Sequence, residues 1–486
     1  MKFSVSKEIK VGRMKETNNL TEGKIFKTIV VLSLPIMAQS FIQMAYNMTD
    51  MLWLGRVGAG AVASVGTAGF LIWFSFALIT IAKIGAEVGV AQSIGKKDNL
   101  LARDFARNAL QLTIVFGVLY TFAMIAFSEH LIGFFQLGEG KVIQEAIGYL
   151  KIVSWGIIFT FVNPVLSGIY NGLGNSKTPF YVNAVGLVIN IVLDPVLIFG
   201  FKLGVNGAAY ATVFSQAVVT TIFIILFRSK RAPFAEFHFF KKPVPKVLKQ
   251  IFVFGTPIGV QSGLFTLFAS LIARIISQWG PVPIAVQKVG SQIEALSWMT
   301  AGGFSTALSS FVGQNYGAKQ WDRISKGYFI TLGLSGFIGI IASILLIFLS
   351  ETIFAFFIPN DPEALRLGSD YLKILGLSQF FMCLEITSQG AYNGLGRTLT
   401  PSLIGITLTG MRIPLAIFLS AATLLGLNGV WWSISMTSVL KGLVLCGLFI
   451  RLLIKHPEVS GPKSITQLIF RHEGKAWHDK RGLSGK

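Results

Sequence analysis

Long apolar stretches separated by short polar breaks run through the whole sequence, and this pattern restricts the chain to a membrane-spanning fold. A helix of about 20 apolar residues crosses the hydrocarbon core of a bilayer. Charged residues make up only 13% of the 486 residues, whereas about a quarter of a soluble domain is charged. The expected spans are residues 25–54, 60–82, 108–128, 147–170, 178–201, 206–227, 248–277, 281–311, 328–350, 369–392, 400–421 and 427–454.

Basic residues are concentrated in alternate loops, which indicates how the spans are oriented. Lys96, Lys97 and Arg103 follow the second expected span, and a basic cluster fills residues 228–249, whereas the intervening loops carry acids such as Glu129 and Glu351. By the positive-inside rule, both termini and the central loop are cytoplasmic, in a multi-pass protein of the plasma (bacterial inner) membrane. The net charge of +20 therefore reflects topology, and nucleic acid is not an expected partner.

Four blocks of the first half recur in the second half at one constant offset, which we call the repeat register. Chance does not hold one register across four blocks, so the halves are structural repeats. Six helices in each half give both halves the same orientation, with an axis along the membrane normal and a central cavity. The paired blocks are residues 35–40 with 257–262, 92–95 with 314–317, 168–174 with 390–396, and 204–207 with 426–429.

The expected fold class is therefore an all-α integral membrane protein, with twelve transmembrane helices in two pseudo-symmetric six-helix bundles around a central cavity. The polar VAQSIG, VGQNYG and YNGLG blocks are expected in cytoplasmic loops between spans. The expected domains are a cytoplasmic tail (1–24), an N-lobe (25–228), a cytoplasmic linker (229–246), a C-lobe (247–455) and a basic cytoplasmic tail (456–486).

The acids that break the repeat are the strongest candidates for function. Asp50 corresponds to Ile272 and Asp194 to Ala416, so both intramembrane acids belong to the first half. A carboxylate at membrane depth usually faces a wet cavity and marks an ion path. With Asn190 and Thr212 they offer oxygen ligands for Na⁺, and a carboxyl group can equally carry H⁺, so both coupling ions remain open. As alternatives, Asp50 could be a carboxylate at a helix end, and Asp194 a cap beside Pro195.

Further residues are candidates for bending and for substrate contact. Pro35 removes one backbone hydrogen bond and is a candidate hinge, although Pro257 in the other half leaves an architectural role open. A cavity lined by Phe and Met would suit varied amphipathic or cationic small molecules. The polar cavity candidates are Gln43, Tyr46, Asn47, Asn163, Asn183, Gln261, Glu294 and Glu385.

Together these blocks resemble the multidrug and toxic compound extrusion family over about residues 20–455. Residues 35–50 (PIMAQSFIQMAYNMTD), VAQSIG, VGQNYG, the two YNGLG segments and residues 304–308 (FSTAL) carry the resemblance. It implies a V-shaped cavity and export of organic cations in exchange for H⁺ or Na⁺. Asp50, Asn190, Asp194 and Thr212 match the ion site of the branch named for DNA-damage-inducible protein F, and Pro35 matches the bending proline. The seventh helix carries Gln261 and Arg274 but no acid, which speaks against a second-lobe sodium site.

The sequence thus predicts an ion-coupled antiporter that exports amphipathic, often cationic, compounds as a monomer among membrane lipid. Neither a cofactor nor a protein-bound metal other than Na⁺ is expected, because the five His and two Cys form no metal motif and no phosphate loop occurs. A flippase for lipid-linked oligosaccharides is the alternative from the same superfamily. A membrane-embedded enzyme is not favoured, because no catalytic constellation is present.

Overall fold

The computed structural model describes residues 19–135, 140–228, 237–359, 361–421 and 425–456, and every regular element in these ranges is helical. The first lobe contains six spans. They are α1 (Ile25–Val57), α2 (Ala59–Gly95), α3 (Asn99–Ala126), α5 (Gly140–Gly172), α6 (Lys177–Pro195) with the π-turn η1 (Val196–Gly200), and α7 (Gly204–Arg228). A short helix, α4 (Ser128–Gly133), lies between α3 and α5.

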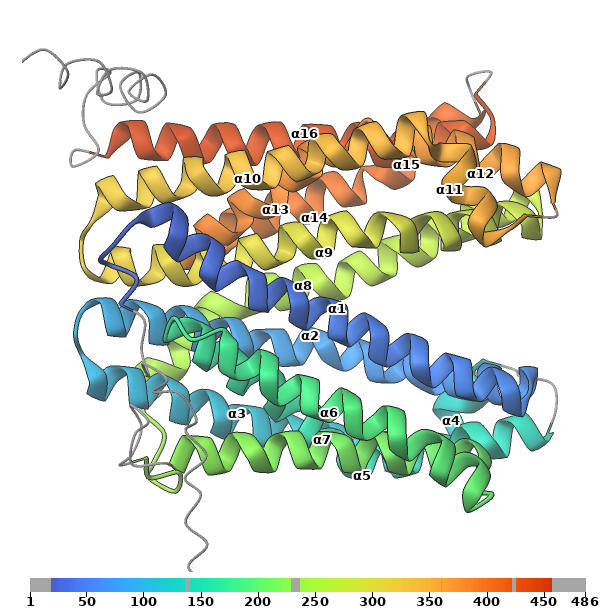
Figure 1. Cartoon of the computed structure of the whole chain (residues 1–486), viewed down its shortest axis with the longest axis horizontal. Coiled ribbons are helices and arrows are strands. Elements are labelled where there is room, and N and C mark those ends of the chain that lie inside the picture. The colour runs from blue at the N-terminus through green and yellow to red at the C-terminus, as the bar shows by residue number, and fades with distance from the viewer. Residues whose placement is uncertain (1–18, 136–139, 229–236, 360, 422–424, 457–486) are drawn as a thin grey trace, which may run out of the picture.

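The second lobe repeats this order. Its six spans are α8 (Pro245–Ile276) with the 3₁₀ turn η2 (Ser277–Trp279), α9 (Pro281–Gly317), α10 (Trp321–Phe348), the pair α12 (Pro362–Gly376) and α13 (Gln379–Gly394), the pair α14 (Leu399–Gly410) and α15 (Arg412–Ala421), and α16 (Leu427–Lys455). The short α11 (Ser350–Phe357) is the counterpart of α4 in the repeat register. The predicted twelve-helix, two-bundle fold is confirmed (Figure 1).

Within the described residues, ten helices are long and apolar enough to cross a membrane. Of the other two spans, α9 brings polar side chains to the cavity, among them Gln287, Lys288 and Glu294, and the remaining span is divided into α12 and α13, of 15 and 16 residues, each too short to cross a bilayer alone. Both had been expected as spans, at residues 281–311 and 369–392.

The first helix of each lobe crosses to the opposite lobe. The first turns of α1, with Ile29 and Leu32, pack in a core with Phe304 and Phe311 of α9, whereas Leu54 near its end packs inside the first lobe. In the same way the start of α8 packs in the first lobe and its end in the second. Pro35 lies within the crossing part of α1, and the helix continues unbroken through it.

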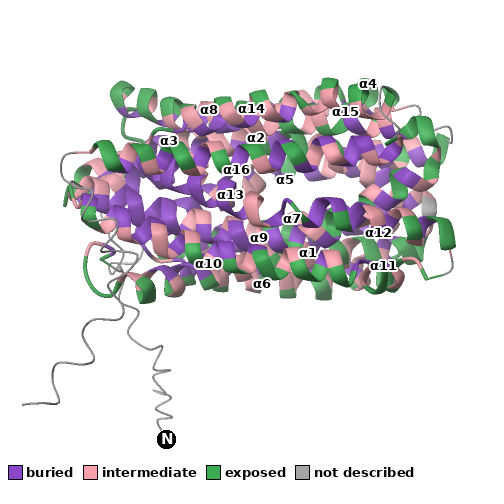
Figure 2. Cartoon of the chain, turned by 90° about the horizontal axis from the view of Figure 1, so that it is seen from above, coloured by how far each residue is buried: buried purple, intermediate pink, exposed green. Residues whose placement is uncertain are grey.

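The lobes meet at one end of the bundle and diverge at the other. Helix α1 begins and α16 ends at the joined end, which is on the left in Figure 1. Buried residues gather there, and Figure 2 shows more exposed and half-buried positions around the centre and the other end.

The polar blocks that we expected in loops are helical, which corrects the sequence analysis. VAQSIG forms the last turns of α2, VGQNYG those of α9, and both YNG segments end helices, with turns at Gly174 (φ 80°) and Gly396 (φ 73°). A span predicted from apolar residues ends where those residues end. The helices continue further, because their polar last turns form hydrogen bonds with the other lobe.

Candidate functional site

The two acids of the first lobe come together. Asp50 on α1 and Asp194 on α6 lie within hydrogen-bonding range of each other, and the Asn190 side chain donates to Asp194 Oδ1 over 3.2 Å. Asn190 and Asp194 are fully buried. Asp194 precedes Pro195 and η1, and such π-turns frequently occur at functional sites.

This acid pair is incompletely satisfied by the protein. Asp50 Oδ1, Asp194 Oδ2, Asn190 Oδ1 and Thr212 Oγ1 are buried without a hydrogen bond of good geometry. The charge that acts on Asp50 is that of Asp194, and no basic residue in the described part of the chain acts on either acid. Two carboxylates in contact repel each other. The arrangement therefore suits a proton shared between them or a cation held by four oxygen-bearing side chains.

Two tyrosines complete this cluster. The Tyr46 hydroxyl lies within hydrogen-bonding range of Thr212 on α7, and Tyr149 on α5 is close enough to both acids to interact with their charges. Both tyrosines are buried. Sequence reasoning missed Tyr149, although the repeat register pairs it with Tyr371, another tyrosine beside an acid.

The other polar candidates of the first lobe do not join the acid pair. Asn163 donates to Gln216 Oε1 over 2.7 Å and accepts from Thr220 Oγ1 over 2.7 Å, so internal bonds occupy its amide. Asn183 donates to the Pro179 carbonyl oxygen over 2.7 Å. Gln43 and Asn47 are exposed on α1. Their roles in substrate contact stay predictions.

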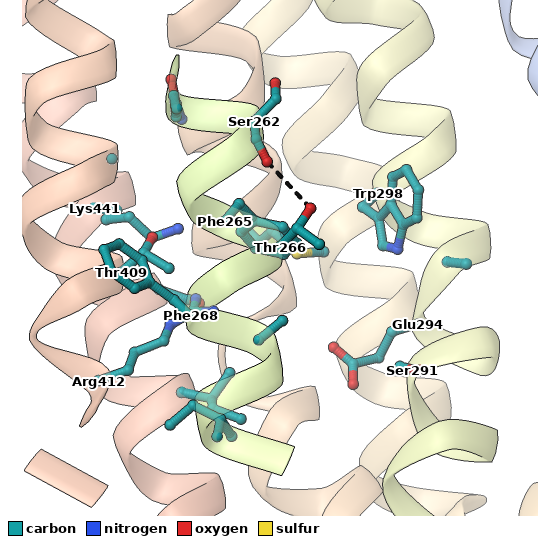
Figure 3. A pocket seen from close by; sticks show the side chains of 18 of the residues that line it. Ser262, Phe265, Thr266, Phe268, Ser291, Glu294, Trp298, Thr409, Arg412 and Lys441 are labelled. Carbon is teal, nitrogen blue, oxygen red and sulfur yellow. Dashed lines mark hydrogen bonds between the residues drawn. The ribbon is translucent and has the colours of Figure 1, made fainter. Parts of the chain in front are cut away.

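A cavity of about 1090 Å³ lies against the second lobe. Trp73, Phe74 and Phe76 of α2 form part of its wall, and α8, α9, α13, α14 and α16 supply most of the rest. Figure 3 shows Glu294 and Trp298 on one side, Arg412 and Lys441 on the other, and the aromatic face of α8 between them. The predicted candidates Gln261, Glu294 and Glu385 all line this cavity.

Glu294 is held in place by two neutral side chains of the protein. Its Oε1 accepts from the Tyr371 hydroxyl over 2.6 Å, and its Oε2 accepts from Gln379 Nε2 over 3.1 Å. Arg412 acts on it only at longer range. Trp298 follows one turn later on α9 and also faces the cavity. A carboxylate beside an aromatic face is suited to an organic cation.

Glu385 differs from Glu294 because the protein supplies its counter-ion. Lys441 Nζ lies 2.8 Å from Glu385 Oε1, and the two side chains are 8% and 9% exposed, so this ion pair is buried. Arg412 nearby donates to Thr437 and Ser438, each over 2.9 Å. Lys441 was not among the sequence candidates, and no local spacing links it to Glu385.

The joined end of the lobes is closed by a reciprocal pair of hydrogen bonds, which we call the gate. Gln92 Nε2 on α2 donates to the Gly394 carbonyl over 3.0 Å, and Gln314 Nε2 on α9 donates to the Gly172 carbonyl over 2.9 Å. The repeat register relates the two bonds to each other. A Cβ atom on Gly95 would fall 1.9 Å from the Gln314 carbonyl oxygen, so only glycine allows the helices this contact.

Comparisons with known proteins agree with this architecture. The MatE family model matches residues 35–196 and 257–418, once in each lobe. The chain is 31% identical over 421 residues to the probable multidrug resistance protein NorM of Thermotoga maritima, covering 84% of this chain and 88% of that protein. A solved MATE in complex with MaD3S superposes with a TM-score of 0.84 at 23% identity, covering 90% of this chain and 98% of that one. An outward-facing multidrug resistance MATE transporter gives 0.83 at 24% identity, with coverages of 91% and 100%.

Two six-helix lobes beside a largely apolar cavity, together with these matches, define a polytopic membrane transporter rather than an enzyme. The chain belongs to the MatE family of such transporters. This confirms the family resemblance. The narrower assignment to the branch of DNA-damage-inducible protein F stays a prediction.

Proposed function

We propose that this chain is a multidrug efflux transporter that exchanges H⁺ or Na⁺ for amphipathic, often cationic, compounds. The observation that carries the proposal is the acid pair of Asp50 and Asp194, which has no basic partner in the described part of the chain. One elementary charge that moves across the membrane supplies about 2.3 kcal/mol per 100 mV. The exchanged ion would therefore drive substrate uphill, and the sequence similarity to a probable multidrug resistance protein supports this reading.

The orientation of the gate determines which step this structure represents. Lys96 and Lys97 follow Gln92 at the end of α2. Arg323, in the first turn of α10 after the gate helix α9, donates hydrogen bonds to the backbone carbonyl oxygens of residues 20, 22 and 23. The positive-inside rule places such basic segments in the cytoplasm. The gate is then the cytoplasmic gate, and the cavity faces outward in an alternating-access cycle. In that cycle α1 bends at Pro35 as the ion binds, which narrows the first lobe.

The cavity of the second lobe provides a substrate site. Glu294 lines the cavity and is held by neutral hydrogen-bond donors rather than by a cation, so its carboxyl group is available to an organic cation. Phe265 and Trp298 offer flat apolar surfaces for an aromatic compound. The pairing of Glu385 with Lys441 makes Glu385 the weaker attraction for a cation.

Ethidium transport by the purified protein in liposomes tests the proposal. An imposed pH or Na⁺ gradient should drive ethidium transport by the unaltered protein, and Asp50→Asn should abolish it, because an amide neither carries a proton nor neutralises a cation. Glu363→Gln removes an exposed acid at the start of α12 and is the matched control. Which gradient works identifies the ion. Normal gradient-driven transport by Asp50→Asn would refute the coupling site.

The flippase alternative would need cationic groups free to bind a pyrophosphate. Lys441 is paired with Glu385, and although Lys288 and Arg412 also line the cavity, Glu294 lies among them and would repel a pyrophosphate. The two functions are separated in cells depleted of the protein. Sensitivity to drugs supports efflux, whereas accumulation of a lipid-linked precursor would support the flippase.

A further inference from the structure

A second buried acid lies between the lobes, at the gate rather than at the acid pair of the first lobe. Glu87 is on α2, five residues before Gln92 of the gate, and is 1% exposed. It packs against α5, where a Cβ atom on Gly168 would lie 3.6 Å from the Glu87 Cβ. Glycines at 168 and 172 let α5 approach the backbone of α2 at this point.

Across the lobe boundary, Glu87 faces the hydroxyl groups of Ser309 and Ser310 on α9. Both Glu87 oxygens and both serine hydroxyls are buried without a hydrogen bond of good geometry. The repeat register makes Ser309 the equivalent of Glu87 in the second half. Glu87 therefore lies at the boundary between the two lobes, and it faces Ser309, the residue at the equivalent position of the second lobe.

The charges around Glu87 do not stabilise a carboxylate well. Lys83, one turn earlier on α2, is the charged residue that acts on it in the described part of the chain, and the two form no ion pair there. Helix α5 presents Gly168 and Gly172, α9 presents Ser309 and Ser310, and neither brings a titratable side chain to it. A buried carboxylate without a close cation is unfavourable, whereas a neutral carboxyl group can donate a hydrogen bond to a serine.

We propose that Glu87 is a proton-binding site of the gate, neutral while the lobes are joined and ionised when they separate. Separation breaks the contact with α9 and admits water, so the proton leaves the carboxyl group for cytoplasmic water. The carboxylate takes a proton from cytoplasmic water again as the gate closes, so this site carries no proton across the membrane.

Glu87 thus links gate closure to a proton, whereas Asp50 and Asp194 bind the driving ion elsewhere. The inference rests on the alternating access that we propose above, and on the cytoplasmic orientation of the gate. It does not require that the acid pair use protons, because a sodium-driven transporter could still close its gate on a neutral Glu87.

Distances across the gate test this site in the full chain. Spin labels on cysteines at Leu100 and Asp322, both exposed in the first turns of α3 and α10, report separation of the lobes. Cys383 and Cys446 are first replaced by Ala. In the otherwise unaltered protein, the fraction with long distances should rise with pH. Glu87→Gln, a neutral side chain of the same shape, should hold the gate closed at every pH and lower that fraction about tenfold or more.

Three further variants separate the explanations. Glu363→Gln should behave like the unaltered protein, and Asp50→Asn should lose ion-driven transport while its gate still responds to pH. If Glu87→Gln is not recovered in folded form, Glu87→Asp, which keeps a carboxyl group, is compared with Glu87→Asn. A Glu87→Gln gate that follows pH normally, or an unaltered gate that responds to Na⁺ but not to pH, would overturn the proposal.

Discussion

The two lobes share one helical plan but compensate their buried acids in opposite ways. In the first lobe Asp50 and Asp194 meet without a basic residue among the described neighbours, and the equivalent positions in the second lobe are Ile272 and Ala416. In the second lobe Glu385 is bound by Lys441. A buried acid is costly unless a proton or a cation compensates it.

The contrast extends to equivalent positions of the repeat. Arg412 of the second lobe takes the place of Asn190, a member of the acid cluster, and Glu385 takes the place of Asn163. The second lobe therefore carries its own cations, whereas in the function that we propose a proton or an ion from water compensates the acid pair of the first lobe. This difference is the physical reason to place ion exchange in the first lobe and substrate recognition in the second.

The largest effect should come from giving the first lobe the residues of the second. The double variant Asp50→Ile/Asp194→Ala copies Ile272 and Ala416, which pack well at the equivalent positions. It should fold with unchanged or higher thermal stability, because no uncompensated acid remains. One exchanged charge supports a ratio of ethidium concentrations across the membrane of about 50-fold per 100 mV. The variant should build up no ethidium gradient. Ethidium accumulation in everted vesicles and thermal unfolding in detergent measure the two effects.

The reverse change removes the internal cation of the second lobe. Lys441→Met leaves Glu385 buried without its partner and should destabilise the protein by about 3–5 kcal/mol. Lys441→Met/Glu385→Gln should recover most of this loss, because no charge is then left unpaired. Lys288→Met, which removes an exposed lysine of the same cavity, is the control. Thermal unfolding compares the four proteins. Equal stability of the single and double variants would show that an unpaired Glu385 does not destabilise the protein.

Glu294 tests the claim that the second lobe selects cations. Its carboxylate should contribute about 1.5–3 kcal/mol to a charged contact, so Glu294→Gln should weaken binding of ethidium about tenfold or more. Binding of an uncharged aromatic compound of similar size should change little, because Trp298 and Phe265 remain. Fluorescence titration of the purified protein gives both affinities. A similar loss of affinity for both compounds would mean that Glu294 determines the shape of the cavity and does not distinguish charged from uncharged compounds.

The sequence alone predicted the repeat, the two lobes and the meeting of Asp50 with Asp194. The repeat and the two lobes follow from periodic and symmetric patterns, which record long-range structure directly, whereas a common site for Asp50 and Asp194 was implied by the family resemblance. It also placed Gln261, Glu294 and Glu385 at a cavity, because polar residues within apolar spans have few other positions.

Other features depend on contacts between distant segments and leave no local pattern. The pairing of Lys441 with Glu385 joins α16 to α13, and no spacing indicates it. Glu87 is not among the sequence candidates, because the expected span ends at residue 82 and an acid outside a span needs no partner. The extension of α2 to Gly95 is fixed by bonds to the other lobe, and hydropathy does not contain that information.

The smallest effect is expected at the gate, because the two lobes contribute nearly symmetric contacts there. Gln92→Ala removes one bond between the lobes and should shift the balance toward the open gate about fivefold, for a bond worth about 1 kcal/mol. Gln314→Ala removes the equivalent bond, but Gln314 Oε1 also accepts from the Leu20 backbone nitrogen over 3.0 Å. Its effect should therefore be larger. The spin-label pair at Leu100 and Asp322 measures both shifts. Equal shifts would show that the bond from Leu20 to Gln314 contributes nothing to closure of the gate. The two glutamine bonds would then stabilise the closed gate by the same free energy.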